Sequence, residues 1–94
     1  MKIPNKIKIV GKTFTVEIRD RLKEDGSDRL GSILYGQQKI IIDSSILEEA
    51  KDQTLLHEIV EGIINLFDLE IEHKDLSILS EALYAVLKDN NLRF

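Results

Sequence analysis

The sequence contains no cysteine and only two histidines among its 94 residues. Without cysteine, neither a disulfide nor a thiolate metal site can form. The chain also lacks an apolar run of the ~20 residues that cross a membrane, and its start lacks the apolar segment of a signal peptide. These absences predict a cytoplasmic protein. Any metal it binds must be held by histidine, aspartate or glutamate, and a site made of histidines alone is excluded.

Charge and composition are those of an ordinary folded domain. The formal net charge is -4, so there is no excess of basic residues to indicate nucleic-acid binding. A hydrophobic content of 43% with 32% charged residues argues against disorder. A chain of this length predicts one domain, residues 1–94, with a core of modest size.

Alternation of apolar and polar residues in the first half of the chain predicts four β-strands in two hairpins. The turn of the first hairpin is expected at Gly11 and Lys12, and that of the second at residues 36–38. Between the hairpins, the charged stretch 20–29 has no periodicity and predicts a mobile loop. Three isoleucines at 40–42 predict burial on both faces, or a central place in the sheet. The expected strands are residues 3–10, 13–20, 31–35 and 39–43.

The second half of the chain has the apolar periodicity of two helices. Residues 46–67 form the first, with Ser45 and Glu48 in the spacing of a capping box at its start. Residues 74–89 form the second. Four strands followed by two helices predict an α+β fold, in which the helices pack on one face of an antiparallel sheet. The apolar face expected for the second helix consists of Leu76, Leu79, Leu83, Val86 and Leu87.

The first helix carries polar residues inside an otherwise apolar run, TLLHEIVEGII at residues 54–64. His57 and Glu61 are four residues apart, so they lie on one face, about 6 Å apart along the axis. Glu58 follows on the polar side of the helix. This is the layout of the H-E-x-x-H zinc helix, in which two side chains four apart bind the metal and the glutamate polarises its water. Here glutamate occupies the place of the second histidine.

A different interpretation of the same residues is structural. In that case His57 lies at the core boundary and donates to a carbonyl, while Glu58 and Glu61 are solvated. If the site binds zinc, a third protein ligand is needed. His73 is the other imidazole, and Glu81 would be level with Glu61 in an antiparallel helix pair. We expect His73, and Glu81 stays open as the alternative.

Four stretches carry a resemblance to a known family. The chain resembles the small phage- and prophage-encoded zincin-like proteins, which are distantly similar to metallopeptidases of the ImmA/IrrE type. The resemblance implies a minimal zincin-like core, in which a strand beside the active helix takes up extended substrate. It also implies cleavage of regulatory proteins of mobile elements. The stretches are KIPNKIKIVGKTFTVEI (2–18), TLLHEIVEGI (54–63), LEIEH (69–73) and ALYAVLKDN (82–90).

Matched residue by residue, the resemblance makes His57 the first metal ligand and Glu58 the general base, with Glu61 where the second histidine belongs. A carboxylate in that place adds negative charge, which lowers the Lewis acidity of the ion and raises the pKa of its water. The expected function is a peptidase dependent on Zn²⁺ or another divalent ion, with His57, Glu61 and His73 as ligands, or a degenerate relative of one. The alternative is a non-enzymatic phage accessory or adaptor protein that uses the fold to bind a partner.

Overall fold

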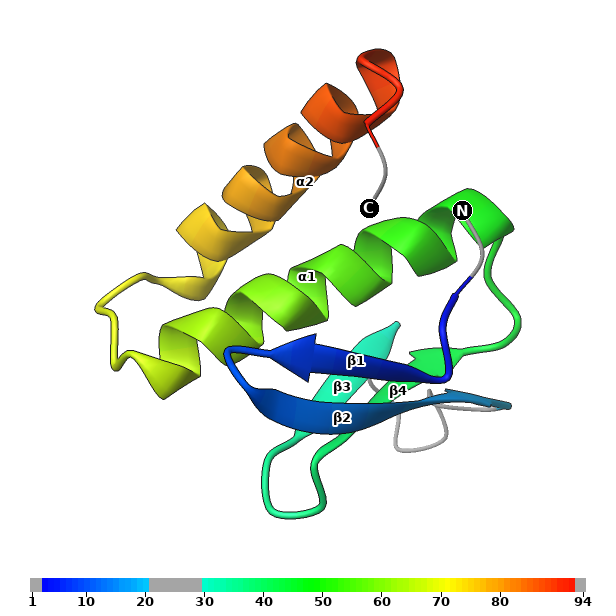
Figure 1. Ribbon diagram of the computed structural model, residues 1–94. Coiled ribbons are helices and arrows are strands. Elements are labelled where there is room, and N and C mark those ends of the chain that lie inside the picture. The colour runs from blue at the N-terminus through cyan, green and yellow to red at the C-terminus, as the bar shows by residue number, and fades with distance from the viewer. Residues whose placement is uncertain (1–2, 21–29, 93–94) are drawn as a thin grey trace.

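The alternating strands and the two periodic helices fold into an α+β domain, as the sequence predicts (Figure 1). The computed structural model describes residues 3–20 and 30–92, so the loop predicted at 20–29 lies, apart from Asp20, outside the described residues. The elements are β1 (Lys6–Ile9), β2 (Lys12–Arg19), β3 (Gly31–Leu34), β4 (Lys39–Asp43), α1 (Glu48–Leu66) and α2 (His73–Asp89).

The sheet is mixed, with strand order β1-β2-β4-β3. The two hairpins are antiparallel as expected, but β2 and β4 pair in parallel, so the prediction of a wholly antiparallel sheet is wrong. The isoleucines of β4 explain the order. Ile40, Ile41 and Ile42 are 0%, 3% and 0% exposed, and a strand apolar on both faces is most stable in the interior of a sheet. Strand β3 is consequently left at the edge.

The first hairpin turns one residue earlier than expected. Ile9 pairs with Lys12, so the two residues of the turn are Val10 and Gly11, with φ angles of 48° and 86°. Two successive positive φ angles are typical of the type I′ turn that matches the twist of a hairpin. Gly11 adopts this conformation freely, whereas a β-branched residue such as Val10 rarely does.

The core lies between the sheet and α1, which runs across one face of it (Figure 1). A second, smaller cluster joins the helices, where Leu76 of α2 packs against Leu56 and Val60 of α1. Neither described helix is long and apolar enough to cross a membrane. The buried residues of the main cluster are Ile9, Phe14, Val16, Ile40, Ile42 and Leu55.

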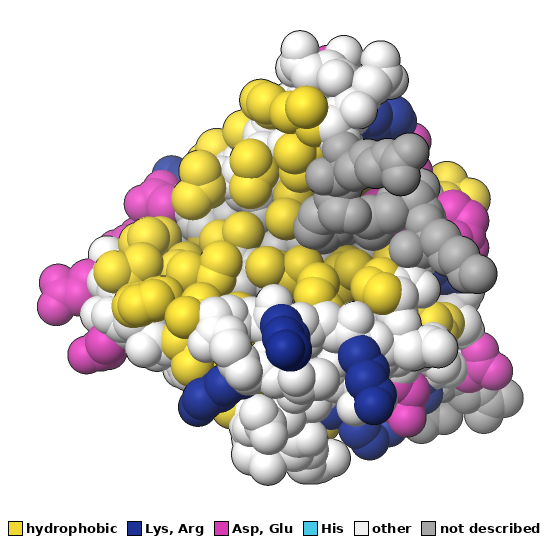
Figure 2. All heavy atoms as spheres, in the orientation of Figure 1, with side chains coloured by type: hydrophobic (Ala, Val, Ile, Leu, Met, Phe, Trp, Pro, Cys, Tyr) yellow, Lys and Arg dark blue, Asp and Glu magenta, His cyan; other side chains and the backbone are white. Residues whose placement is uncertain are grey.

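Only part of the apolar face predicted for α2 is covered. Leu76 is buried, but Leu79, Leu83 and Val86 are 51%, 39% and 51% exposed. Figure 2 shows hydrophobic side chains gathered along α2 and across the middle of this face, on which no histidine is visible. Among the described elements, α2 packs against α1 and not against the sheet. A single neighbouring helix covers only a narrow part of the apolar face of α2, so the rest of that face stays exposed. The prediction that all these residues face the core is therefore wrong.

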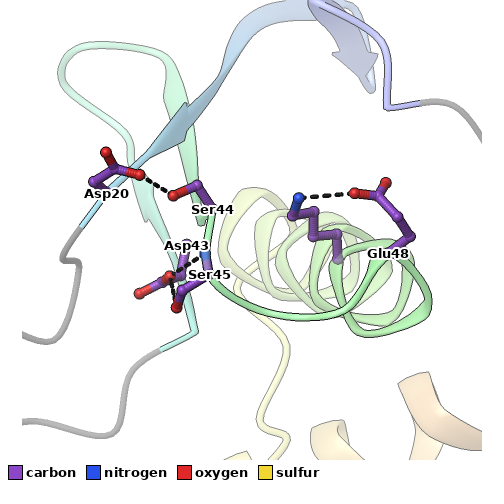
Figure 3. A network of polar contacts seen from close by, with 6 residues as sticks. Asp20, Asp43, Ser44, Ser45 and Glu48 are labelled. Atoms are coloured by element: carbon purple, nitrogen blue, oxygen red, sulfur yellow. Dashed lines mark hydrogen bonds and ion pairs between the residues drawn. The ribbon is translucent and has the colours of Figure 1, made fainter.

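The predicted capping box does not form at the start of α1. The backbone amide and hydroxyl of Ser45 donate instead to the Asp43 carboxylate, at 2.8 and 2.5 Å, and Glu48 pairs with Lys51 at 2.9 Å (Figure 3). The N-cap residue is Leu47, whose side chain makes no capping hydrogen bond. Because Asp43 ends β4 and is 1% exposed, its hydrogen bonds hold the connection that leads from the sheet into α1.

Candidate metal centre

His57, Glu58 and Glu61 come together on one side of α1, and each offers a ligand atom within 4.8 Å of the others. The Nε2 atom of His57 lies 3.9 Å from Oε2 of Glu61, as the i, i+4 spacing predicts. Bonds from zinc to nitrogen or oxygen are about 2 Å long, so two ligands of one tetrahedral ion are roughly 3.3 Å apart. A small rotamer adjustment of either side chain closes that difference, and the donor set therefore fits a divalent ion.

Glu58 does not face solvent, contrary to its place on the polar side of the helix. Its side chain is buried, at 4% exposure, because the edge strand β3 packs over it. A Cβ added to Gly31 would lie 3.5 Å from Cγ of Glu58 and 2.4 Å from Cγ2 of Thr54. Glycine at this position thus permits the close approach of β3 to α1, which removes Glu58 from water.

Gly31→Ala is expected to destabilise the fold by about 1–3 kcal/mol, because overpacking of a tight contact forces the backbone or a side chain to move. The atom in the way is the methyl group of Thr54. This side chain is β-branched and its hydroxyl donates to Ala50 at 2.7 Å, so it cannot turn aside freely. The measurement is urea unfolding of the variant and of the wild type.

Thr54→Ser removes that methyl group and keeps the hydroxyl. The double variant Gly31→Ala, Thr54→Ser is expected to regain most of the stability lost in Gly31→Ala, relative to Thr54→Ser alone. Equal losses on the two backgrounds would show that the contact between β3 and α1 is not what requires glycine at position 31.

An open cleft of about 660 Å³ lies over these residues, walled by β3, α1 and α2. Both candidates for the third ligand line it. His73 is the first residue of α2, and its ring is 5.2 Å from that of His57, centroid to centroid, in an edge-to-face arrangement. Glu81 lines the same cleft from two turns further along the helix. The tertiary structure therefore leaves both His73 and Glu81 as candidates.

Burial lowers the pKa of His57 below its ordinary value, and the charges of Glu61 and Glu81 act in the opposite direction. The neighbouring His73 lowers the pKa further. The imidazole of His57 is consequently neutral at pH 7, which is the form that binds a metal. Its side chain is 24% exposed, so it remains reachable from the cleft.

Two further polar residues stand beside the site, and the sequence carried no signal for either. The hydroxyl of Tyr35 donates to the backbone oxygen of Glu61 at 3.4 Å. Burial raises the pKa of Tyr35, and the charges of Glu61 and Glu58 raise it further, so the hydroxyl stays protonated and can donate. Ser80 of α2 places its Oγ 3.4 Å from Nδ1 of His57. A single tyrosine in a turn and a single serine in a helix are too common to be recognised as site residues from sequence.

Comparison of the chain with protein-family models, with characterised proteins and with solved structures gives no match. The fold and the site together define an α+β domain in which one imidazole and two carboxylates are gathered on a single helix, beside the edge strand β3 of the described sheet. The chemistry of the cleft has to be derived from these residues.

Proposed function

We propose that this protein is a metal-dependent peptidase of the zincin-like kind, encoded by a phage or another mobile element and acting on a protein or peptide. One observation carries the proposal. His57, Glu58 and Glu61 present ligand atoms within 4.8 Å of one another, in an open cleft. If Glu58 were merely a solvated residue of the helix surface, its side chain would not be 4% exposed and next to an imidazole whose pKa is lowered by burial.

The residues that would hold the ion are His57, Glu61 and His73. His73 is preferred to Glu81 because a second neutral imidazole completes a set of two histidines and one glutamate, as found in catalytic zinc sites. A divalent ion held there supplies Lewis acidity towards a carbonyl oxygen and lowers the pKa of a water molecule.

Glu58 is the residue that moves the proton. Its carboxylate accepts the proton of the attacking water and returns it to the nitrogen of the leaving amine. Its side chain is buried beneath β3 and lines the cleft in which that water would stand. The protonated hydroxyl of Tyr35 lines the same cleft and donates its hydrogen to the backbone oxygen of Glu61, so it stands beside the carboxylate that would hold the ion.

The substrate class is an extended peptide. Gly31, Ser32 and Ile33 of β3 line the cleft, and β3 is one of the two edge strands of the described sheet. An edge strand offers backbone donors and acceptors to which an extended chain can pair. Such pairing would lay a peptide bond alongside Glu58 and Glu61.

The direct test is metal analysis of the protein purified without a histidine tag from cells supplied with zinc. Near-stoichiometric divalent metal is expected. A wild-type chain that stays metal-free at micromolar zinc would contradict the proposal. It would favour the alternative of a non-enzymatic adaptor, for which the exposed Leu79, Leu83 and Val86 of α2 are the relevant surface.

Substitution of His73 and of Glu81 distinguishes the two candidate ligands. Zinc at 100 times its Kd stabilises a folded protein by about 2.7 kcal/mol, which for a domain of this size raises the Tm by roughly 10 °C or more. His73→Ala is expected to remove most of that rise, and Glu81→Ala little of it. Thermal melts with zinc and with a chelator provide the measurement. The reverse result would make Glu81 the third ligand.

A further inference from the structure

Ser80 is a buried polar residue of α2 that lines the cleft and contacts His57 of the candidate metal centre. It is 3% exposed, although a serine in a surface helix normally faces water. Its Oγ has two neighbours: the backbone oxygen of Ser77 at 3.1 Å and Nδ1 of His57 at 3.4 Å. The second contact joins the two helices, because His57 belongs to α1.

The roles in these two contacts follow from the chemistry of a hydroxyl group. Ser80 has a single hydrogen to donate and two lone pairs to accept with. The carbonyl oxygen of Ser77 can only accept, and it is the nearer neighbour, so the hydrogen goes to it. Donation from a serine to the carbonyl three or four residues earlier is common inside helices. What Ser80 offers to His57 is therefore a lone pair.

Because the Ser80 oxygen presents a lone pair to Nδ1, it favours one of the two neutral forms of the His57 imidazole. When Nδ1 carries the hydrogen, it donates to Ser80; when Nε2 carries it, two lone pairs face each other. On the other side of the ring, Oε2 of Glu61 is 3.9 Å from Nε2, which is too long for a hydrogen bond. Of these two contacts of the ring, the one with Ser80 is the one within hydrogen-bond distance.

We infer that Ser80 is a positioning residue that holds His57 in its Nδ1–H form, so that the lone pair of Nε2 points into the cleft towards Glu61. The role in metal binding rests on the proposed function, but the position of the hydrogen does not. Histidines that bind metals almost always donate their other ring N–H to a fixed acceptor, and this orients the ring and raises its basicity. Here the acceptor, Ser80, belongs to α2, so the packing of the two helices orients the ring of His57 on α1.

The tautomer can be measured on the metal-free protein by the ¹⁵N chemical shifts of the two ring nitrogens of His57. The spectra are recorded at about pH 8, where a histidine with a lowered pKa is neutral. The expected result is Nδ1–H in the wild type and a shift towards Nε2–H, the form favoured by histidine in water, in Ser80→Ala. Ser77→Ala is the matched control, because it keeps the backbone oxygen to which Ser80 donates.

Ser80→Thr retains the hydroxyl and is expected to restore the Nδ1–H form. A merely structural role of Ser80 would change the melting temperature of Ser80→Ala without moving the hydrogen. Nε2–H in the wild type, or the same tautomer ratio in the wild type and in Ser80→Ala, would overturn the inference.

A second readout uses zinc alone as the probe. Loss of such an orienting partner typically weakens metal binding by about 10–100-fold, and this is the loss expected for Ser80→Ala, with Ser77→Ala close to the wild type. Unchanged zinc affinity in Ser80→Ala would overturn the role of Ser80 in metal binding. If the wild type itself binds no zinc, the proposed function fails, and the ¹⁵N shifts still decide whether Ser80 positions the ring.

Discussion

Glu58→Gln is expected to lower peptidase activity at least about 100-fold while the metal content and the fold stay those of the wild type. General acid–base catalysis by a positioned side chain contributes about 10²–10⁴-fold. Glutamine has the size of glutamate, so it fills the same space under β3, but its amide does not take up a proton. The substitution therefore separates proton transfer from packing at a residue that is 4% exposed.

The assay is hydrolysis of a fluorogenic peptide mixture by zinc-loaded protein, with zinc content and Tm measured on the same samples. Glu70→Gln makes the same chemical change at an exposed residue outside the cleft and serves as the control. Activity of Glu58→Gln within about tenfold of the wild type would show that Glu58 is not the general base.

His57→Ala is expected to lose the metal, with zinc affinity falling at least about 100-fold. This is a larger loss than the removal of a residue that only hydrogen-bonds to a ligand typically causes. His57 is the imidazole of the cluster and is neutral at pH 7 because burial lowers its pKa, so no other residue of that cluster replaces it. Glu61→Ala is expected to weaken binding less, because the carboxylate of Glu58 lies within 4.8 Å and can partly substitute.

Zinc stoichiometry and titration with a competing chelator measure both effects. Gln53→Ala is the matched control: Gln53 lies on α1 one turn before His57, lines the same cleft and is exposed. If His57→Ala held zinc as tightly as the wild type, His57 would not be a ligand and the boundary-histidine interpretation would stand.

The pairing of His57 with Glu61 is the part of the candidate site that the sequence determined by itself. Two residues four apart on a helix are neighbours whatever the rest of the fold does. The same holds for the elements: alternation and helical periodicity were enough to predict four strands, two helices and the α+β class. The three isoleucines of β4 were likewise enough to predict burial on both faces, which the sheet confirms.

Only the tertiary structure decided which surfaces meet. The parallel pairing of β2 with β4, the burial of Glu58 and the exposed row on α2 depend on which element packs against which. A helical wheel drawn for one segment carries no information about its neighbours. In the sequence, the backbone N–H of Ser45 has two nearby carboxylate acceptors, Glu48 in the expected capping box and Asp43, and in the fold it donates to Asp43.

The same reason explains why Ser80 and Tyr35 could not be found from sequence. They lie 23 and 26 residues from their partners, His57 and Glu61, and a contact over that separation exists only because α2 folds back on α1 and β3 reaches the edge of the sheet. Local spacing fixes which side chains share a face of one helix. The packing of separate elements decides which of those side chains are dehydrated, which are reached from a second element, and hence which can perform chemistry.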